Sequence, residues 1–181
     1  TSYKLAKLYL DPMKQTFDVD HYLAIHRFLF EDIYPFAGEI REESISKRIP
    51  FCLPQFIYSE LKRTLKNAMS QISQITSREE LLKFITVLYS DLDIIHPFRE
   101  GNGRTEREFI RQLIDHICQK NHLEPYYLDY GLIEDREGYI DAVVKADALL
   151  DYSDLFLLFD SILVVRQDVL TDEKAATNRK K

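Results

Sequence analysis

Residues 96–107 read His-Pro-Phe-Arg-Glu-Gly-Asn-Gly-Arg-Thr-Glu-Arg, and this stretch decides the fold around it. One apolar helical segment ends just before it and another begins within it, so its glycines lie at a helix start. The first N–H groups of a helix lack intrahelical partners and carry the positive end of the helix dipole. The stretch therefore predicts an anion site. Arg104 and Arg107, spaced i, i+3, would project from one side of the helix and hold a polyphosphate.

Several groups in this stretch are suited to chemistry. An imidazole has an ordinary pKa near 6.5, so His96 can accept a proton near neutral pH, although a role as a helix C-cap is the alternative. Glu100 offers a carboxylate to a metal ion. The backbone of residues 101–103 offers a ring of N–H donors, and Asn102 is also expected to cap the new helix. Phe98 is expected in the core, where it would hold His96 in position.

A second interpretation of the stretch needs no chemistry. Pro97 would mark a turn between two helices, and the arginines would be neutralised on the surface by Glu106 and Glu108. Glu100 would then be an exposed acid favourably placed at a helix start. The joint occurrence of all these residues at fixed spacing favours a functional site over this alternative.

The stretch resembles the signature of the Fic family, H-x-F-x-[DE]-G-N-[GK]-R-x-x-R, and every specified position matches. Residues 34–41, Tyr-Pro-Phe-Ala-Gly-Glu-Ile-Arg, are similar to a second family segment, Tyr-x-[Trp/Phe]-Ala-Gly-x-x-Arg, which precedes a flap. The resemblance covers residues 30–159, densely at these two places. It implies an all-α fold, a Fic-type helical bundle with a short β-hairpin flap beside the active site.

The resemblance also implies a reaction, adenylylation (AMPylation) of a protein. His96 would be the general base that deprotonates a Ser, Thr or Tyr hydroxyl on a target protein. That oxygen would attack the α-phosphorus of ATP, leaving AMP on the target and releasing pyrophosphate. Glu100 would bind Mg²⁺. The nucleotide would be held by Gly101, Asn102, Gly103, Arg104, Arg107, Tyr139 and Asp147.

The identity of residue 103 bears on the choice of reaction. The Doc branch of the family has Lys at this position, binds the nucleotide inverted and acts as a kinase, whereas this chain has Gly103. Adenylylation is therefore favoured, and a Doc-like kinase or another nucleotide-monophosphate transferase is the alternative enzyme. A catalytically silent nucleotide-binding module is the alternative outside the enzymes. His96→Ala separates them, because a module keeps its function and an enzyme loses turnover.

Two assignments rest on weaker parts of the resemblance. Arg48 stands where the family often has Gly, so the turn of the flap would need a residue that tolerates positive φ poorly. The resemblance places Tyr139 and Asp147 on the adenine side of the nucleotide. Without a role in binding, Tyr139 would be a half-buried aromatic residue of a helix and Asp147 a surface charge. The flap, which would dock the target by strand addition, comprises Ile45, Ser46, Lys47, Arg48 and Phe51.

Composition limits the class of protein. With 181 residues, the chain is expected to form a single Fic domain over residues 1–171, followed by a polar tail over 172–181. A formal net charge of −6 argues against a nucleic-acid partner. Neither a signal peptide nor an apolar run long enough for a membrane span is recognisable, so we expect a cytoplasmic location. Cys52 and Cys118 are expected to be free thiols.

Helical periodicity predicts most of the secondary structure. Ser77 and Glu80 form a capping box for a buried helix that ends at Ile95 and delivers His96. The only expected non-helical element is a hairpin over residues 43–53. Further helices are predicted over residues 21–30, with Asp18 or Asp20 as cap, 54–72, 103–120, 136–150 and 154–170.

An inhibitory motif that many Fic proteins contain is not found in this sequence. Many Fic proteins carry an inhibitory helix with the motif [ST]-x-x-x-E-[GN]. Glu is followed by Gly or Asn only at residues 100–101 and 137–138, and neither has Ser or Thr four positions earlier. We therefore expect inhibition from a separate antitoxin-like protein, as in toxin–antitoxin pairs, from a segment before Thr1, or not at all.

Overall fold

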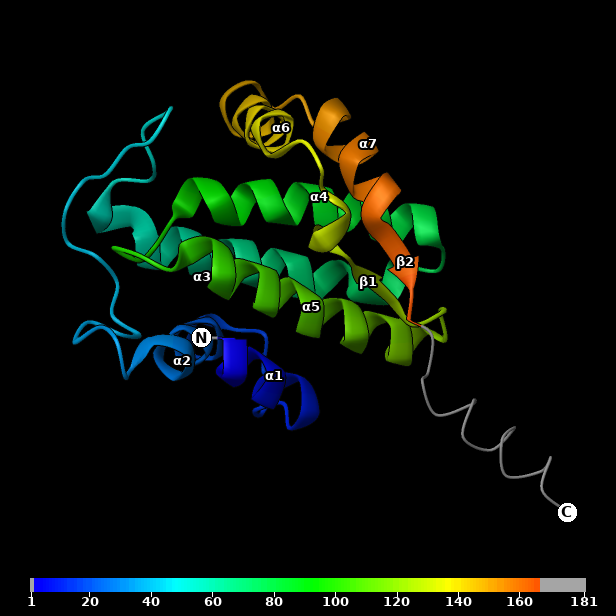
Figure 1. The fold of residues 1–181 in the computed structure, drawn as a ribbon, viewed down its shortest axis with the longest axis horizontal. Helices are drawn as coiled ribbons and strands as arrows, with labels where there is room; N and C mark the ends of the chain where they lie inside the picture. The colour runs from blue at the N-terminus through cyan, green and yellow to red at the C-terminus, as the bar shows by residue number, and fades with distance from the viewer. Residues whose placement is uncertain (1, 167–181) are drawn as a thin grey trace, which may run out of the picture.

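Two long helices, α4 (Arg78–Ile95) and α5 (Asn102–Asn121), run through the middle of the molecule and are joined by the His-Pro-Phe loop (Figure 1). The structure, a computed structural model, describes residues 2–166. Both helices bury apolar residues at helical spacing, among them Ile85, Leu88 and Leu92 on α4 and Phe109 and Leu113 on α5. The loop between them is thereby fixed at one end of the core.

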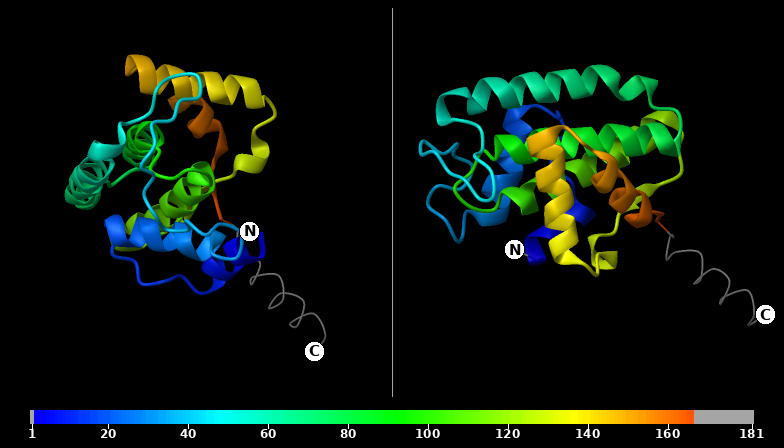
Figure 2. Two further views of the ribbon diagram at one scale, coloured as in Figure 1. Left: turned by 90° about the vertical axis from the view of Figure 1, so that its left-hand side faces the viewer. Right: turned by 90° about the horizontal axis from the view of Figure 1, so that it is seen from above.

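The remaining helices surround this pair. Helix α2 (Val19–Phe30) packs on α5, and α1 (Ser2–Leu10) packs on α2. Helix α3 (Pro54–Gln71) lies along α4, as the view from above shows (Figure 2). Helices α6 (Arg136–Leu149) and α7 (Ser153–Ile162) cover another side of α4. Two short 3₁₀ helices, η1 (Ile72–Gln74) and η2 (Tyr130–Leu132), lie in the connections.

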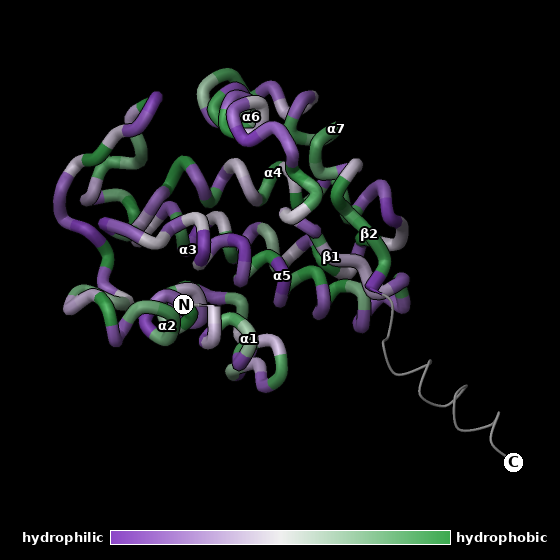
Figure 3. Tube along the Cα trace, in the orientation of Figure 1, coloured by the Kyte–Doolittle hydropathy of each residue, from purple (hydrophilic) through white to green (hydrophobic). Residues whose placement is uncertain are grey.

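Hydrophobic and hydrophilic residues alternate along α3, α4 and α5, as expected for helices with one face in the core (Figure 3). Within residues 2–166, none of the helices combines the length and the apolar character needed to cross a membrane.

Helix starts follow the predicted capping residues. The carboxylate of Asp18 accepts a hydrogen bond from the His21 N–H (3.0 Å) at the start of α2. The hydroxyl of Ser77 accepts from the Glu80 N–H (3.2 Å) at the start of α4. The returning half of this capping box is displaced by one residue, because the Glu80 carboxylate accepts from the Thr76 N–H (2.7 Å).

The C-terminal part of the fold differs from the prediction. The helix predicted over residues 154–170 ends at Ile162, and the chain continues as strand β2 (Leu163–Val165). This strand pairs antiparallel with β1 (Tyr126–Leu128), an element the sequence did not predict, as it did not predict α1. The Leu-Val-Val run favours a strand once a partner strand lies beside it. Residues 167–170, the boundary at 171 and the predicted tail over 172–181 lie outside the described residues.

The flap over residues 43–53 is confirmed as non-helical. An isolated antiparallel bridge joins Ser46 and Pro50, and the Phe51 N–H donates to the Ile45 carbonyl (3.3 Å). The flap lies beside the end of α4, at the side of the molecule where the His-Pro-Phe loop is found (Figure 1).

The buried ring of Phe98 offers a test of how the loop is anchored. Phe98 is 0% exposed, so Phe98→Ala should lower the free energy of unfolding by about 3–5 kcal/mol, the usual cost of removing a buried aromatic ring. Urea unfolding followed by circular dichroism measures this loss. Leu157→Ala is the control, because Leu157 is 66% exposed and its removal should change stability by less than about 0.5 kcal/mol. Equal effects of the two variants would contradict the anchoring role of Phe98.

Candidate active site

The loop that follows α4 is held by its own side chains. His96 ends the helix with a left-handed backbone (φ 45°, ψ 62°), and its N–H donates to the Leu92 carbonyl (3.2 Å). Phe98 then enters the core and stacks on the ring of His26, with centroids 3.7 Å apart. The side-chain amide of Asn102 accepts from the Phe98 N–H (2.8 Å) and donates to the Phe98 carbonyl (2.7 Å). The loop is therefore closed on itself before α5 begins.

The start of α5 departs from the prediction in one respect. Asn102 was expected to cap the helix, but it is the first helical residue, and Gly101 occupies the cap with φ 87°. The Asn102 side chain is engaged by Phe98, so it cannot also cap the helix. A Cβ atom at Gly101 would lie 2.6 Å from the Phe30 ring, so both its φ angle and its surroundings require glycine.

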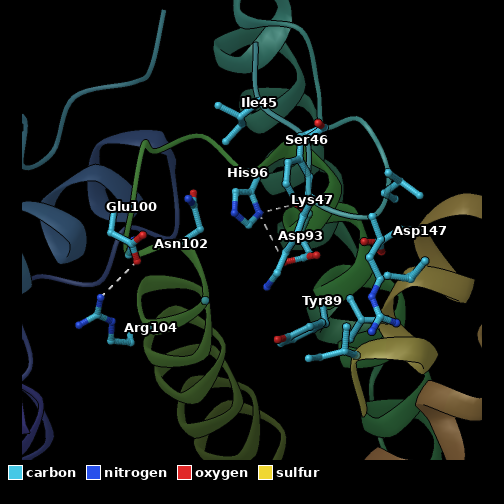
Figure 4. A pocket seen from close by; sticks show the side chains of 18 of the residues that line it. Ile45, Ser46, Lys47, Tyr89, Asp93, His96, Glu100, Asn102, Arg104 and Asp147 are labelled. Carbon is cyan, nitrogen blue, oxygen red and sulfur yellow. Dashed lines mark hydrogen bonds and ion pairs between the residues drawn. The ribbon is translucent and has the colours of Figure 1, made fainter. Parts of the chain in front are cut away.

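The ring of His96 is oriented from two sides, and Figure 4 shows its contact with Asp93. Its Nδ1 lies 3.1 Å from the Asp93 carbonyl and 3.6 Å from the Asp93 carboxylate. The ring stacks on Phe51 of the flap, with centroids 3.8 Å apart. Donation from Nδ1–H to the Asp93 carbonyl leaves Nε2 as the acceptor. His96 is thus a helix C-cap in its backbone and is also available as a base through its ring.

A cavity of about 680 Å³ opens beside this ring. It lies between the flap, the His-Pro-Phe loop, the start of α5 and α6. Every residue that the sequence assigned to the site lines it, including the five flap residues. The cavity is large enough for a nucleotide, since ligand pockets usually measure about 300–1,000 Å³.

The two predicted phosphate-binding arginines both reach this cavity. The guanidinium of Arg104 lies over the Phe30 ring at 4.5 Å and 3.5 Å from the Glu100 carboxylate. The guanidinium of Arg107 lies over the Tyr130 ring at 5.3 Å. Aromatic faces support both cations without neutralising them.

The acids next to these arginines do not fit the surface interpretation. Glu106 is 1% exposed and Glu108 is 4% exposed, so neither forms a solvated surface pair. Glu108 pairs instead with Arg111 (2.7 Å), which also contacts Asp115 (2.9 Å). Burial, reinforced by nearby carboxylates, raises the pKa of Glu106 well above its usual range, which disfavours its charged form and weakens it as a counterion for Arg107.

The end of the cavity formed by α4 and α6 is polar and buried. The hydroxyls of Tyr139 and Tyr89 are hydrogen-bonded to each other, and burial raises the pKa of Tyr139 to about 12. The Asp147 carboxylate accepts from the Ser90 hydroxyl (2.6 Å). Burial, together with Asp93, raises the pKa of Asp147 to about 8. The interpretation of Asp147 as a simple surface charge is therefore wrong.

The flap closes over the cavity toward α6. Arg48 forms ion pairs with Glu137 and Asp141, which are spaced i, i+4 on α6. Arg48 does not have a positive φ angle. An arginine in place of glycine therefore creates no backbone strain at this position. Arg48 instead adds a link between the flap and the wall of the cavity opposite His96.

Sequence reasoning assigned no role to Tyr89 and Asp93, which line the cavity, or to Arg41, which donates to the His96 carbonyl. A signal for Asp93 existed, because it precedes His96 by three residues and so shares its helix face. Arg41 was part of the second family-like segment but received no role. Tyr89 carried no signal, because its partner Tyr139 lies fifty positions away in the sequence.

The fold and this cavity define a helical-bundle domain built around a histidine loop and an arginine-bearing helix start. A model of the Fic/DOC family matches residues 16–114. The chain is 32% identical over 168 residues to the Probable protein adenylyltransferase Fic of Escherichia coli K12, covering 90% of this chain and 77% of that protein. The chain therefore belongs to the Fic/DOC family, and the resemblance noted from the sequence is confirmed.

Two further comparisons agree with this placement. The Probable protein adenylyltransferase y4lH of Sinorhizobium fredii is 32% identical over 132 residues, 71% of this chain, and the match spans only 65% of that relative's length. The BepC protein of Bartonella tribocorum, solved with bound AMPPNP, superimposes with a TM-score of 0.75 at 22% identity, covering 92% of this chain and 83% of that one. This likeness confirms the predicted Fic-type helical bundle.

The proton held by Asp147 predicts how stability depends on pH. Because its pKa is raised from 3.8 to about 8, the folded protein binds a proton that the unfolded chain has lost between these values. The free energy of unfolding should therefore fall as pH rises from about 5 to about 8. Asp147→Asn removes this effect, so the variant should gain stability relative to the wild type over that range.

Urea unfolding at several pH values measures this difference. Asp160→Asn, which changes an exposed carboxyl on α7, is the control. Its free energy of unfolding should differ from that of the wild type by the same amount at every pH from about 5 to about 8. A constant difference for Asp147→Asn as well would show that the buried carboxyl does not hold its proton.

Proposed function

We propose that the protein is a protein adenylyltransferase, which transfers AMP from ATP to a Ser, Thr or Tyr hydroxyl of a target protein. The observation that carries this proposal is the placement of His96, the start of α5 and two arginines around one cavity. The names of the relatives, protein adenylyltransferases, support the reaction type. The AMPPNP bound to the Bartonella BepC protein supports ATP as the nucleotide.

We assign His96 as the general base. With Nδ1–H donating to the Asp93 carbonyl, Nε2 accepts the proton of the target hydroxyl. The deprotonated oxygen attacks the α-phosphorus of ATP, and the bond from that phosphorus to the oxygen bridging to the β-phosphate breaks. Pyrophosphate leaves with the electron pair, and AMP remains on the target.

The leaving pyrophosphate needs positive charge, and the start of α5 supplies it. The first residues of α5 line the cavity at the positive end of the helix, and Arg104 and Arg107 line it as well. Charge-assisted hydrogen bonds from guanidinium groups to phosphate contribute about 1.5–3 kcal/mol each. These donors are fixed before the reaction, so they stabilise the developing charge without reorganising.

Glu100 fits a role in holding Mg²⁺. Its side chain is 60% exposed at the cavity, and its Oε1 accepts from the Gly101 N–H (3.0 Å). No group of three or more His, Cys, Asp or Glu side chains is placed to hold a metal in the described part of the chain, so the ion would depend on the nucleotide. One carboxylate with phosphates and waters is the usual coordination of Mg²⁺. The bound ion would neutralise charge on the phosphates.

The flap is suited to docking the target. Residues 45–49 and Phe51 line the cavity, and Phe51 contacts the His96 ring. A target segment that adds to the flap as a strand would therefore lie next to the base. An antitoxin-like protein that occupies the arginine side of the cavity would act as an inhibitor.

Label transfer tests the reaction. The protein, incubated with Mg²⁺, cell lysate and ATP labelled at the α- or γ-phosphate, should place the α-label alone covalently on a target. His96→Ala should abolish this transfer and still bind ATP, because the base contributes to chemistry and not to phosphate binding. Covalent γ-label alone would assign a Doc-like kinase instead, and no label with intact ATP binding would indicate a silent module.

The metal role of Glu100 is tested by titration with Mg²⁺. Glu100→Gln should raise the Mg²⁺ concentration that gives half-maximal transfer by about tenfold or more, since losing a charged ligand costs at least 1.4 kcal/mol. Glu60→Gln, which removes another glutamate paired with an arginine, is the matched control. An unchanged Mg²⁺ requirement in Glu100→Gln would remove Glu100 from the metal site.

A further inference from the structure

A buried arginine lies between the flap and the loop that carries His96. Arg41 is 1% exposed, and its guanidinium donates to backbone carbonyls of both segments. It binds the two ends of the flap through the carbonyls of Glu43 and Cys52, each at 2.6 Å. It also binds the end of α4 through the carbonyls of His96 (2.8 Å) and Ile95 (3.4 Å). The planar guanidinium has five donors and a permanent charge, so one side chain bridges both segments.

The carbonyls on either side of Ile95 and His96 are also hydrogen-bonded to the flap segment. The Ile94 carbonyl accepts from the Cys52 N–H (2.9 Å), and the Pro97 carbonyl accepts from the Arg41 N–H (2.9 Å). Four successive carbonyls, from residue 94 to residue 97, are therefore bound by Arg41 and Cys52. The last carbonyls of a helix lack partners within the helix and carry its negative end, which makes a buried cation favourable here.

The backbone of His96 depends on this support. A left-handed backbone is disfavoured for a residue with a Cβ atom and persists where the surroundings enforce it. The His96 carbonyl is held by Arg41, and the His96 ring stacks on Phe51, which precedes Cys52 in the flap. Both the backbone and the ring of the proposed base are therefore in contact with the flap segment.

We propose that Arg41 is a positioning residue that couples the flap to His96, so that the two open and close as one unit. The coupling is a property of the fold and does not require any transfer reaction. Its consequence for catalysis rests on the proposed function: a target that docks on the flap would order the base in the same event. Arg41 would then affect the rate of transfer more than the binding of ATP.

Amide hydrogen exchange of the unmodified protein tests the coupling without turnover. The N–H groups of Arg41, Cys52 and His96 should have protection factors within about threefold of one another and the same denaturant dependence, because one opening exposes all three. The Lys47 N–H at the tip of the flap should exchange faster. Protection factors at Cys52 and His96 that differ by more than about tenfold would overturn the coupling.

A conservative substitution tests the role of the guanidinium. Arg41→Lys keeps the charge but places all donors on one nitrogen, which cannot span four carbonyls. Exchange at Cys52 and His96 should accelerate together, by about tenfold or more. Arg111→Lys, which disturbs a half-buried, salt-bridged arginine away from the flap, is the control and should leave both sites unchanged. Faster exchange at Cys52 with His96 unchanged would overturn the proposal.

The kinetic readout separates positioning from binding. In Arg41→Lys, kcat for transfer should fall at least about tenfold while the KM for ATP stays within about threefold of the wild type. An equal rise in KM with kcat unchanged would assign Arg41 to nucleotide binding and overturn its positioning role. If the wild type transfers nothing, the proposed function fails and the exchange experiment still decides the coupling. If Arg41→Lys does not fold, the exchange data of the wild type decide it.

Discussion

The chain reversal between α4 and α5 constrains the rest of the molecule. Within a few residues one helix ends and a second begins. The last carbonyls of the first helix and the first N–H groups of the second lack partners within their helices, so they need hydrogen bonds from elsewhere in a partly buried region. Asn102 closes the loop through Phe98, while Arg41 and Cys52 bind the carbonyls at the end of α4. The start of α5 lines the cavity, where the positive end of the helix dipole favours an anion. The same constraint thus holds His96 in place and sets the start of α5 beside it.

Charge is distributed to suit this arrangement. The protein has a formal net charge of −6, yet positive groups gather around the start of α5. Acidic groups occupy the other end of the cavity, where Asp93 and Asp147 lie, and burial together with Asp93 raises the pKa of Asp147 to about 8. A nucleotide would therefore meet cations at its phosphates and neutral or acidic hydrogen-bonding groups at its base. This polarity agrees with the orientation that the proposed reaction needs.

Much of this architecture could be predicted from the sequence, because the signals were local. The residues from His96 to Arg107 predicted a loop between two helices, and the structure places the predicted site residues around one cavity. The β1–β2 pair could not be predicted, since three-residue strands become stable only with a distant partner. The role of Asn102 was also misjudged, because its partner Phe98 is revealed only by the closed loop. The contacts of Arg41 link residues more than fifty positions apart, and no local pattern reports them.

The proposed reaction requires the cavity to bind ATP with its α-phosphorus toward His96 and its terminal phosphates toward Arg107. A crystal structure with Mg²⁺ and an ATP analogue that cannot be cleaved between the α- and β-phosphates would reveal this orientation. We expect the adenine near Tyr139 and Asp147, the γ-phosphate at the arginines, and the α-phosphorus facing the Nε2 of His96. An inverted nucleotide, with its γ-phosphate next to His96, would rule out adenylylation by this site.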